Sequence, residues 1–142
     1  MIHIERINRF DLIYEIMEKH ENDFFSRNID RKKLAEKMSR FGCFLVSYFD
    51  EDIAGFAGYY ANDMTSKTGY LSVIVISQKY RGKGVGNRLL RECLDDCRRR
   101  GMKKCRLEVN KSNQGAIRFY IANGFVRESS AGEISDYYIC YL

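Results

Sequence analysis

Residues 81–86 read Arg-Gly-Lys-Gly-Val-Gly, and they lie between a strand-like stretch and a helix-like stretch. The preceding run, Leu-Ser-Val-Ile-Val-Ile at 71–76, is short and rich in β-branched residues, which predicts a buried strand. The following segment has apolar residues three and four apart, which predicts a helix over about 84–100. Glycines at a strand-to-helix turn leave backbone N–H groups uncovered, and the helix start adds unpaired N–H groups and the positive end of its dipole. The turn is therefore predicted to bind phosphate oxygens.

The glycine spacing excludes two common nucleotide-binding loops. A dinucleotide-binding loop has the pattern Gly-x-Gly-x-x-Gly, whereas Gly82, Gly84 and Gly86 are two residues apart. A nucleoside-triphosphate loop needs Ser or Thr after its lysine, and Lys83 is followed by glycine. The remaining pattern, Arg-x-x-Gly-x-Gly, resembles the coenzyme A pyrophosphate loop of the GCN5-related N-acetyltransferase superfamily. A simple tight turn would explain the glycines but not Arg81.

A second block strengthens the resemblance. Leu-Glu-Val at 107–109 reads as a strand, and the residues after it have the spacing of that superfamily's next helix and strand: Asn113, Ala116, Phe119, Tyr120, Asn123, Gly124 and Phe125. The resemblance implies one N-acetyltransferase domain over residues 1–142. The implied fold is α/β (α+β), a mixed, mostly antiparallel central sheet flanked by helices, the acyl-CoA N-acyltransferase fold. The predicted order β-α-α-β-β-β-α-β-α-β-β agrees with it.

The same resemblance implies acetyl-CoA as cosubstrate and a primary amine that attacks it directly. In this family the backbone around the glycine turn holds the pyrophosphate, here Arg81, Gly82, Lys83, Gly84, Val85 and Gly86. The preceding strand splays from its neighbour, so backbone groups of Ile74 and Ile76 would bind the pantetheine arm, and a backbone N–H nearby would polarise the thioester carbonyl. Asn113 would reach the same arm, and a helix N-cap role for Asn113 is compatible with that contact.

Tyr120 matches the family's tyrosine that protonates the departing thiolate. A phenol with a reference pKa near 10 is suited to donate a proton to a thiolate. The alternative is a core tyrosine, because Tyr120 shares a helix face with Ala116 and Ile117.

The general base is less clear from the sequence. Many family members place a glutamate early on the strand before the glycine turn, but Lys-Thr-Gly-Tyr-Leu at 67–71 contains no carboxylate. Glu108 is the candidate, since Leu-Glu-Val followed by Tyr120 resembles the branch that acetylates ribosomal-protein N-termini. Strand alternation places Glu108 on one face with Arg106 and Asn110. The alternatives are a surface pair with Arg106, a purely structural carboxylate, or a water chain as base with Asp63 or Tyr70 contributing.

No sequence motif identifies the acceptor substrate. It would be set by the loop with Phe24 and Phe25, the turn at 61–68 and the C-terminal hairpin, and strand tyrosines including Tyr59, Tyr60, Tyr70, Tyr137 and Tyr138 suggest a stacking cleft. An amino sugar and a protein or peptide amine both remain open. Because the strand glutamate is missing, a non-catalytic acyl-CoA-binding regulatory module on the same fold is the alternative function.

Composition narrows the partners. The net charge is +5, but acidic residues are interleaved with the basic ones, and Lys79, Arg81, Lys83 and Arg88 cluster where a phosphate-rich cofactor would lie. We therefore expect no nucleic-acid partner.

Five cysteines without a Cys-x-x-Cys pair and two histidines predict no metal site. No membrane-length apolar run or signal-peptide pattern occurs, so a cytoplasmic protein without membrane contact is expected. Exposed strand edges would allow a homodimer.

Overall fold

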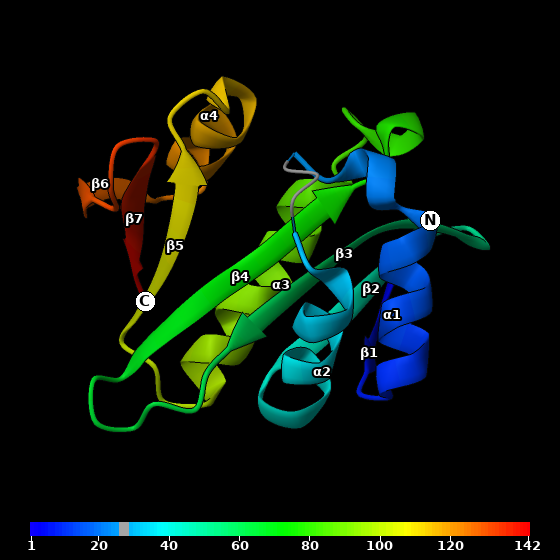
Figure 1. Cartoon of the computed structure of the whole chain (residues 1–142), viewed down its shortest axis with the longest axis horizontal. Coiled ribbons are helices and arrows are strands. Elements are labelled where there is room, and N and C mark those ends of the chain that lie inside the picture. Colours follow the sequence, from blue (N-terminus) through cyan, green and yellow to red (C-terminus); the bar gives the residue numbers. More distant parts are fainter. Residues whose placement is uncertain (26–28) are drawn as a thin grey trace.

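The computed structural model describes residues 1–25 and 29–142. Figure 1 shows a twisted sheet with helices on both faces. The strands are β1 (Ile2–Ile7), β2 (Cys43–Phe49), β3 (Asp52–Tyr60), β4 (Thr68–Ile76), β5 (Lys104–Asn110), β6 (Val126–Ser130) and β7 (Ser135–Tyr141). The α-helices are α1 (Phe10–Lys19), α2 (Arg31–Phe41), α3 (Val85–Arg99) and α4 (Gln114–Ala122), with short 3-10 turns at Glu21–Asp23 and Gln78–Tyr80.

The sheet order is β1-β2-β3-β4-β5-β7-β6, and β4 with β5 is its parallel pair. The other neighbouring strands run antiparallel. Helices α1 and α2 cover one face, while α3 packs against β2, β3 and β4 from the other face (Figure 1). This arrangement confirms the predicted mixed, mostly antiparallel sheet flanked by helices. Among the described residues, no helix combines the length and apolar character that a membrane crossing requires.

Two apolar layers hold the helices on the sheet. On the α1 and α2 side, Ile13 and Met38 pack against Phe44 and Phe56 of the sheet. On the other side, the buried face of α3 belongs to one apolar cluster with residues of β5 and α4. The cluster includes Leu89, Leu90, Cys93 and Cys97 of α3, Leu107 of β5 and Tyr120 of α4. Each fully buried aliphatic or aromatic side chain contributes about 1.5–3 kcal/mol to folding. The five cysteines are all buried free thiols, as expected for reduced cysteine in a core.

The helix ends follow ordinary capping chemistry. The side chain of Asp30 caps α2 by accepting a hydrogen bond from the backbone N–H of Lys33 at 3.0 Å. After α3 and α4 the chain turns at Gly101 (φ +90°) and Gly124 (φ +94°), a left-handed conformation that glycine adopts without a Cβ clash. The predicted loop with Phe24 and Phe25 continues into residues 26–28, which lie outside the described residues.

Strands β4 and β5 pair over only three residue pairs and then diverge. Their register ends at the pair Tyr70–Arg106, and in Figure 1 the two strands meet near the C-terminus and separate toward α4. The divergence coincides with a β-bulge: Gly58 pairs with Val73 while Tyr59 pairs with Leu71, so Ser72 has no partner on β3. A bulge bends its strand and changes which face its side chains occupy. The backbone of β4 beyond Tyr70 therefore faces an open gap, which is the splay that the family resemblance implied.

Candidate active site

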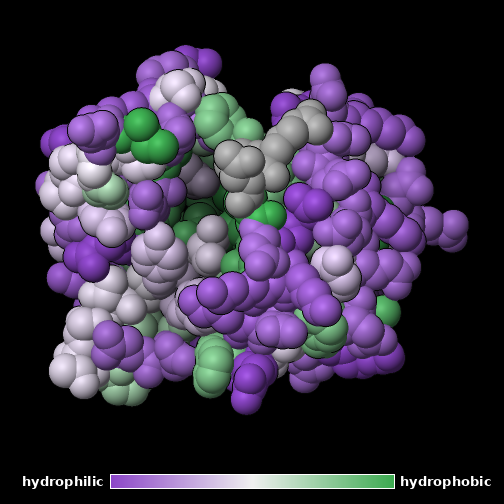
Figure 2. Space-filling view, in the orientation of Figure 1, coloured by the Kyte–Doolittle hydropathy of each residue, from purple (hydrophilic) through white to green (hydrophobic). Residues whose placement is uncertain are grey.

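A cavity of about 190 Å³ occupies the gap between β4 and β5. Figure 2 shows the surface hollowed between the part formed by β5, β7 and α4 and the part formed by α1 and α2. Two sets of residues line the cavity. The sheet and α4 supply Leu71, Ser72, Val73, Ile74, Val75, Leu107, Glu108, Val109, Asn110, Asn113 and Tyr120, and the loop before α2 supplies Phe24, Phe25 and Ile29. The cavity thus joins Glu108, Tyr120, Asn113 and Ile74 of the predicted site.

Tyr120 lies at the wall of this cavity, and 9% of the residue's surface is exposed. Its ring packs against that of Phe125, with centroids 5.7 Å apart. The hydroxyl forms no hydrogen bond with the described residues. Burial, together with the nearby Cys105, raises the pKa of the Tyr120 phenol above its usual value. The phenol therefore stays protonated through the neutral range, and it is both packed in the core and in contact with the cavity.

Glu108 stands on the exposed face of β5 at the rim of the cavity. The alternative of a surface pair with Arg106 is wrong, because Arg106 binds Glu128 instead: its Nε and Nη2 donate to the two carboxylate oxygens at 2.6 and 3.0 Å. Glu108 forms no ion pair within the described part of the chain. The neighbours of Glu108 are aromatic. Tyr137 is its direct partner on β7. Burial and, as the second cause, the charge of Glu108 raise the pKa of Tyr70 to about 12.

Asn113 has a structural role and also lines the cavity, and the end of β4 is tied to the glycine turn. The Oδ1 atom of Asn113 accepts a hydrogen bond from the backbone N–H of Ala116 at 3.3 Å, so this side chain caps α4 while it lines the cavity. Ile74 lines the cavity, whereas Ile76 does not. The carbonyl oxygen of Ile76 accepts a hydrogen bond from Arg81 Nε at 3.2 Å, which ties the glycine turn to the end of β4.

The glycine turn is open to a ligand. Gly82 (φ +78°) and Gly84 (φ +82°) have left-handed backbones, and a Cβ added at either would meet no heavy atom within 4 Å. Gly84 also precedes the first residue of α3 without a side-chain cap, so backbone N–H groups of that first turn lack an intrahelical partner. Val85 is buried and offers only its backbone. These features fit the diphosphate of coenzyme A.

Gly86 has a different reason to be glycine. A Cβ at this position would lie 3.3 Å from Cε1 of Phe119 and 3.5 Å from Cγ1 of Ile76. The contact with Phe119 would be tighter than ordinary van der Waals packing, so the missing side chain allows the start of α3 to approach α4 closely. Because residue 86 has no side chain, the glycine turn can pack closely against α4, the helix that carries Tyr120.

The basic side chains around the turn are not equivalent. Lys83 and Arg81 are exposed, and Nζ of Lys83 lies 5.9 Å from the centre of the Phe49 ring. Lys79 is partly neutralised, because its Nζ lies 3.5 Å from a carboxylate oxygen of Asp52. Arg98, Arg99 and Arg100 form ion pairs with acidic residues of their own helix, as expected for a solvated helix end. Lys83 and Arg81 are therefore the cations best placed to add charge at the turn.

Sequence patterns located part of this site and missed the rest. Ser72 and Ile29 line the cavity but belong to no sequence motif. The turn at 61–68 does not line the cavity. Tyr59 is also not part of a stacking cleft, since its hydroxyl donates to Asp96 on α3 at 2.5 Å, on the other side of the sheet. Within the described residues, no group of three or more His, Cys, Asp or Glu side chains could hold a metal ion.

Replacing Gly84 with alanine tests the glycine turn. A left-handed backbone costs a residue with a Cβ about 1–2 kcal/mol, so we expect relaxation of this turn to weaken acetyl-CoA binding about tenfold. Gly132→Ala is the matched control, because Gly132 also has a positive φ (+121°) with no heavy atom within 4 Å of an added Cβ. Calorimetric titration should show weaker binding only for Gly84→Ala, and equal affinities in both variants would contradict a role in cofactor binding.

Comparison with known proteins identifies the family. The sequence profile described as "Acetyltransferase (GNAT) family" matches residues 10–125. The chain belongs to the GNAT family. The predicted resemblance is therefore confirmed.

A GNAT relative and two solved structures show the range of similarity. N-alpha-acetyltransferase 30 of Schizosaccharomyces pombe is 35% identical over 63 residues, which are 44% of this chain and 42% of that protein. The ribosomal-protein-S18-alanine N-acetyltransferase of Escherichia coli has a TM-score of 0.77 at 22% identity, over 98% of this chain and 91% of that one. The PaiA N-acetyltransferase of Thermoplasma acidophilum, solved in complex with coenzyme A, has a TM-score of 0.73 at 19% identity over 99% of both chains.

These similarities differ in what they establish. The two solved structures share the GNAT fold with this chain, which confirms the predicted acyl-CoA N-acyltransferase architecture. The chain spans half or less of the length of the N-alpha-acetyltransferases that it matches. Their acceptors are therefore a starting point for a proposal about this chain.

Proposed function

We propose that residues 1–142 act as one domain that transfers the acetyl group of acetyl-CoA to the α-amino group of a peptide or protein. The observation that carries this proposal is the cavity between β4 and β5, which joins a buried phenol, a carboxylate without an ion pair among the described residues, and the edge of β4 that β5 leaves unpaired beyond Tyr70. The open glycine turn lies beyond the end of β4, and solved relatives of this fold include a complex with coenzyme A.

The glycine turn and the end of β4 would position the cosubstrate. When bound, acetyl-CoA supplies the acetyl group as a thioester. The backbone around Gly82 and Gly84 would bind its diphosphate, with Lys83 and Arg81 adding positive charge. The backbone of β4 beyond Tyr70 would bind the pantetheine arm, and one of its N–H groups would stabilise the oxyanion that forms at the thioester carbonyl. Loss of one such donor costs about 2.7–4 kcal/mol of transition-state stabilisation.

Glu108 and Tyr120 would then move the protons. Glu108 would accept a proton from the incoming ammonium, directly or through water, so that the neutral amine attacks the carbonyl carbon. Tyr120 would donate its phenolic proton to the thiolate as the C–S bond breaks. Because the amine attacks the thioester itself, no acyl-enzyme intermediate is needed. Glu108 has no ion pair with the described residues, which favours this catalytic role over a purely structural carboxylate and over a non-catalytic acyl-CoA-binding module.

A peptide amine is preferred to an amino sugar for two reasons. The relatives named N-alpha-acetyltransferases and the ribosomal-protein-S18-alanine enzyme act on protein amino termini by their names. The rim around Glu108 also carries aromatic rings, with Tyr137 beside it on β7 and Phe25 across the cavity. Aromatic side chains of this kind suit the backbone and side chains of an extended peptide.

An acceptor panel tests the proposal. Release of free thiol from acetyl-CoA would be followed with short peptides, with the same peptides carrying a blocked amino terminus and an internal lysine, and with a nucleotide-linked amino sugar. We expect turnover with the free-terminus peptides and none with their blocked forms. Turnover with the amino sugar alone would contradict the acceptor assignment, and tight acetyl-CoA binding without transfer to any amine would contradict catalysis.

A further inference from the structure

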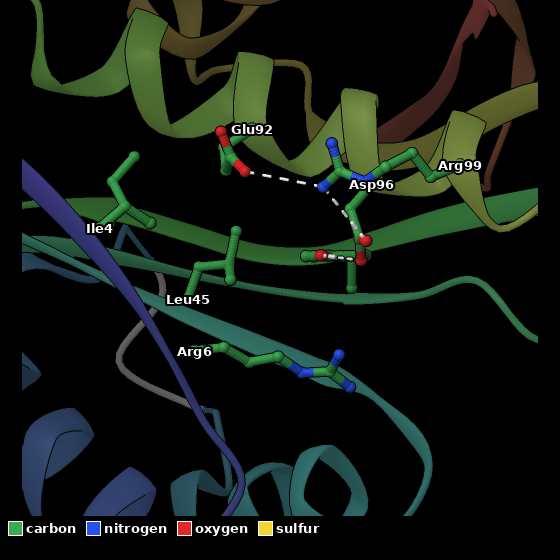
Figure 3. A pocket seen from close by; sticks show the side chains of 7 residues that line it. Ile4, Arg6, Leu45, Glu92, Asp96 and Arg99 are labelled. Carbon is green, nitrogen blue, oxygen red and sulfur yellow. Dashed lines mark hydrogen bonds and ion pairs between the residues drawn. The ribbon is translucent and has the colours of Figure 1, made fainter.

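A second cavity, of about 210 Å³, lies between the edge strand β1 and helix α3 (Figure 3). It shares no lining residue with the cavity at Tyr120. Its apolar lining consists of Ile4 on β1 and Leu45 on β2, with Tyr59 of β3 beside them. Helix α3 packs against β2, β3 and β4. The edge strand β1 lies beyond this contact, and the cavity occupies the space between β1 and the helix. Its charged lining comes from Arg6 on β1 and from Glu92, Asp96 and Arg99 on α3.

One carboxylate in this cavity is already satisfied. Asp96 accepts hydrogen bonds from the Tyr59 hydroxyl at 2.5 Å and from Arg100 Nε at 2.8 Å through Oδ2. Its Oδ1 accepts from Arg99 Nη2 at 3.4 Å. Asp96 therefore joins α3 to β3, and it has little capacity left for a ligand.

Two other charged groups do have capacity, and they have opposite signs. Arg6 forms no hydrogen bond or ion pair with the described residues. Glu92 has an ion pair with Arg99 at 3.7 Å, which is too long for a hydrogen bond. In Figure 3 Arg6 and Glu92 lie on opposite sides of the cavity, with Ile4 and Leu45 between them. A guanidinium matches a carboxylate in charge and geometry, and a carboxylate accepts hydrogen bonds from an ammonium.

We propose that this cavity binds a small zwitterion, an α-amino acid with an aliphatic side chain. Its carboxylate lies against Arg6, its ammonium against Glu92, and its side chain on Ile4 and Leu45. The size supports this class, because 210 Å³ is about the space of seven waters in the liquid and lies below the roughly 300 Å³ of a drug-sized pocket. A ligand without a carboxylate would leave Arg6 without a partner, and a ligand without an ammonium would leave Glu92 with only its 3.7 Å ion pair to Arg99.

Calorimetric titration of the full chain tests the proposal. The probes are L-leucine and two analogues that each lack one charged group, 4-methylpentanoate without the amine and 3-methylbutylamine without the carboxylate. We expect L-leucine to bind and each analogue to bind at least about tenfold more weakly. Arg6→Gln and Glu92→Gln should each weaken L-leucine binding by a similar factor. Arg91→Gln, an exposed neighbour on α3 that does not line the cavity, should leave it unchanged.

One further variant separates this cavity from the proposed acceptor site, where the amine of L-leucine could also bind. Glu108→Gln should retain L-leucine binding, whatever its effect on acetyl transfer. The proposal is overturned if L-leucine gives no binding heat, if its binding survives both Arg6→Gln and Glu92→Gln, or if an analogue with one charge binds equally well. Binding that disappears in Glu108→Gln alone would assign the amino acid to the acceptor site and would overturn the proposal equally. Thermal unfolding of each variant checks that the fold is retained.

Discussion

The Tyr120→Phe variant is expected to turn over about 100 times more slowly than the unmodified protein while binding acetyl-CoA with the same affinity. The substitution removes only the phenolic hydroxyl, and the ring remains packed against Phe125. Because the thiolate would then leave without a proton donor, the loss should fall on kcat. Single-turnover kinetics and calorimetric titration with acetyl-CoA would measure the two quantities separately.

Tyr138→Phe is the matched control for this experiment. Tyr138 is also a buried tyrosine of the same apolar layer, and it does not line the cavity. Its variant reports the effect of deleting one buried hydroxyl without affecting the proposed proton transfer. An unchanged kcat in Tyr120→Phe, or an equal loss in both variants, would exclude Tyr120 as the acid. Because burial raises the pKa of Tyr120, the phenol remains a donor at mildly alkaline pH.

The second large effect is expected for Glu108→Gln. Glutamine keeps the size of the side chain but cannot accept the proton of an ammonium, so we expect kcat at neutral pH to fall by about 100-fold. The deficit should shrink as the pH rises through about 8, because a peptide α-amino group has a pKa near 7.7–8.0 and becomes neutral without a base. A pH profile of kcat with a peptide acceptor would measure this recovery.

The control for Glu108→Gln is Glu51→Gln, an exposed glutamate in the turn between β2 and β3. It should show the rate and the pH profile of the unmodified protein. A deficit in Glu108→Gln that stays constant with pH would indicate that Glu108 positions the acceptor and does not accept its proton. No deficit at all would leave water, with Tyr70 as a contributor, as the base.

The parts of the fold that depend on local patterns could be predicted from the sequence. The predicted order of strands and helices matches the structure, and the three-and-four spacing of apolar residues predicted a helix at about 84–100, which spans Val85–Arg99. The glycine spacing and the block around Tyr120 identified the family. These signals act over a few residues, which is why a single sequence contains them.

Features that depend on pairing between distant segments could not be predicted in this way. Arg106 selects Glu128, 22 residues away, over the nearer Glu108, because the β5–β7–β6 register brings Glu128 within reach. The face of the sheet on which the Tyr59 side chain lies could not be predicted either. Strand β3 is buried over most of its length on both faces, so its sequence lacks the alternation that would show which face each tyrosine occupies.

The close approach at Gly86 has a consequence for which thioesters the protein can use. The start of α3 touches Phe119, and Phe119 is the residue next to Tyr120 on α4. Under the roles proposed above, this contact sets a fixed span from the diphosphate to the sulfur atom. An acyl donor with a shortened arm would fall short of the phenol even with its phosphates correctly held. Donor selection by length would thus be built into the packing of two helices, without any side chain that recognises the arm.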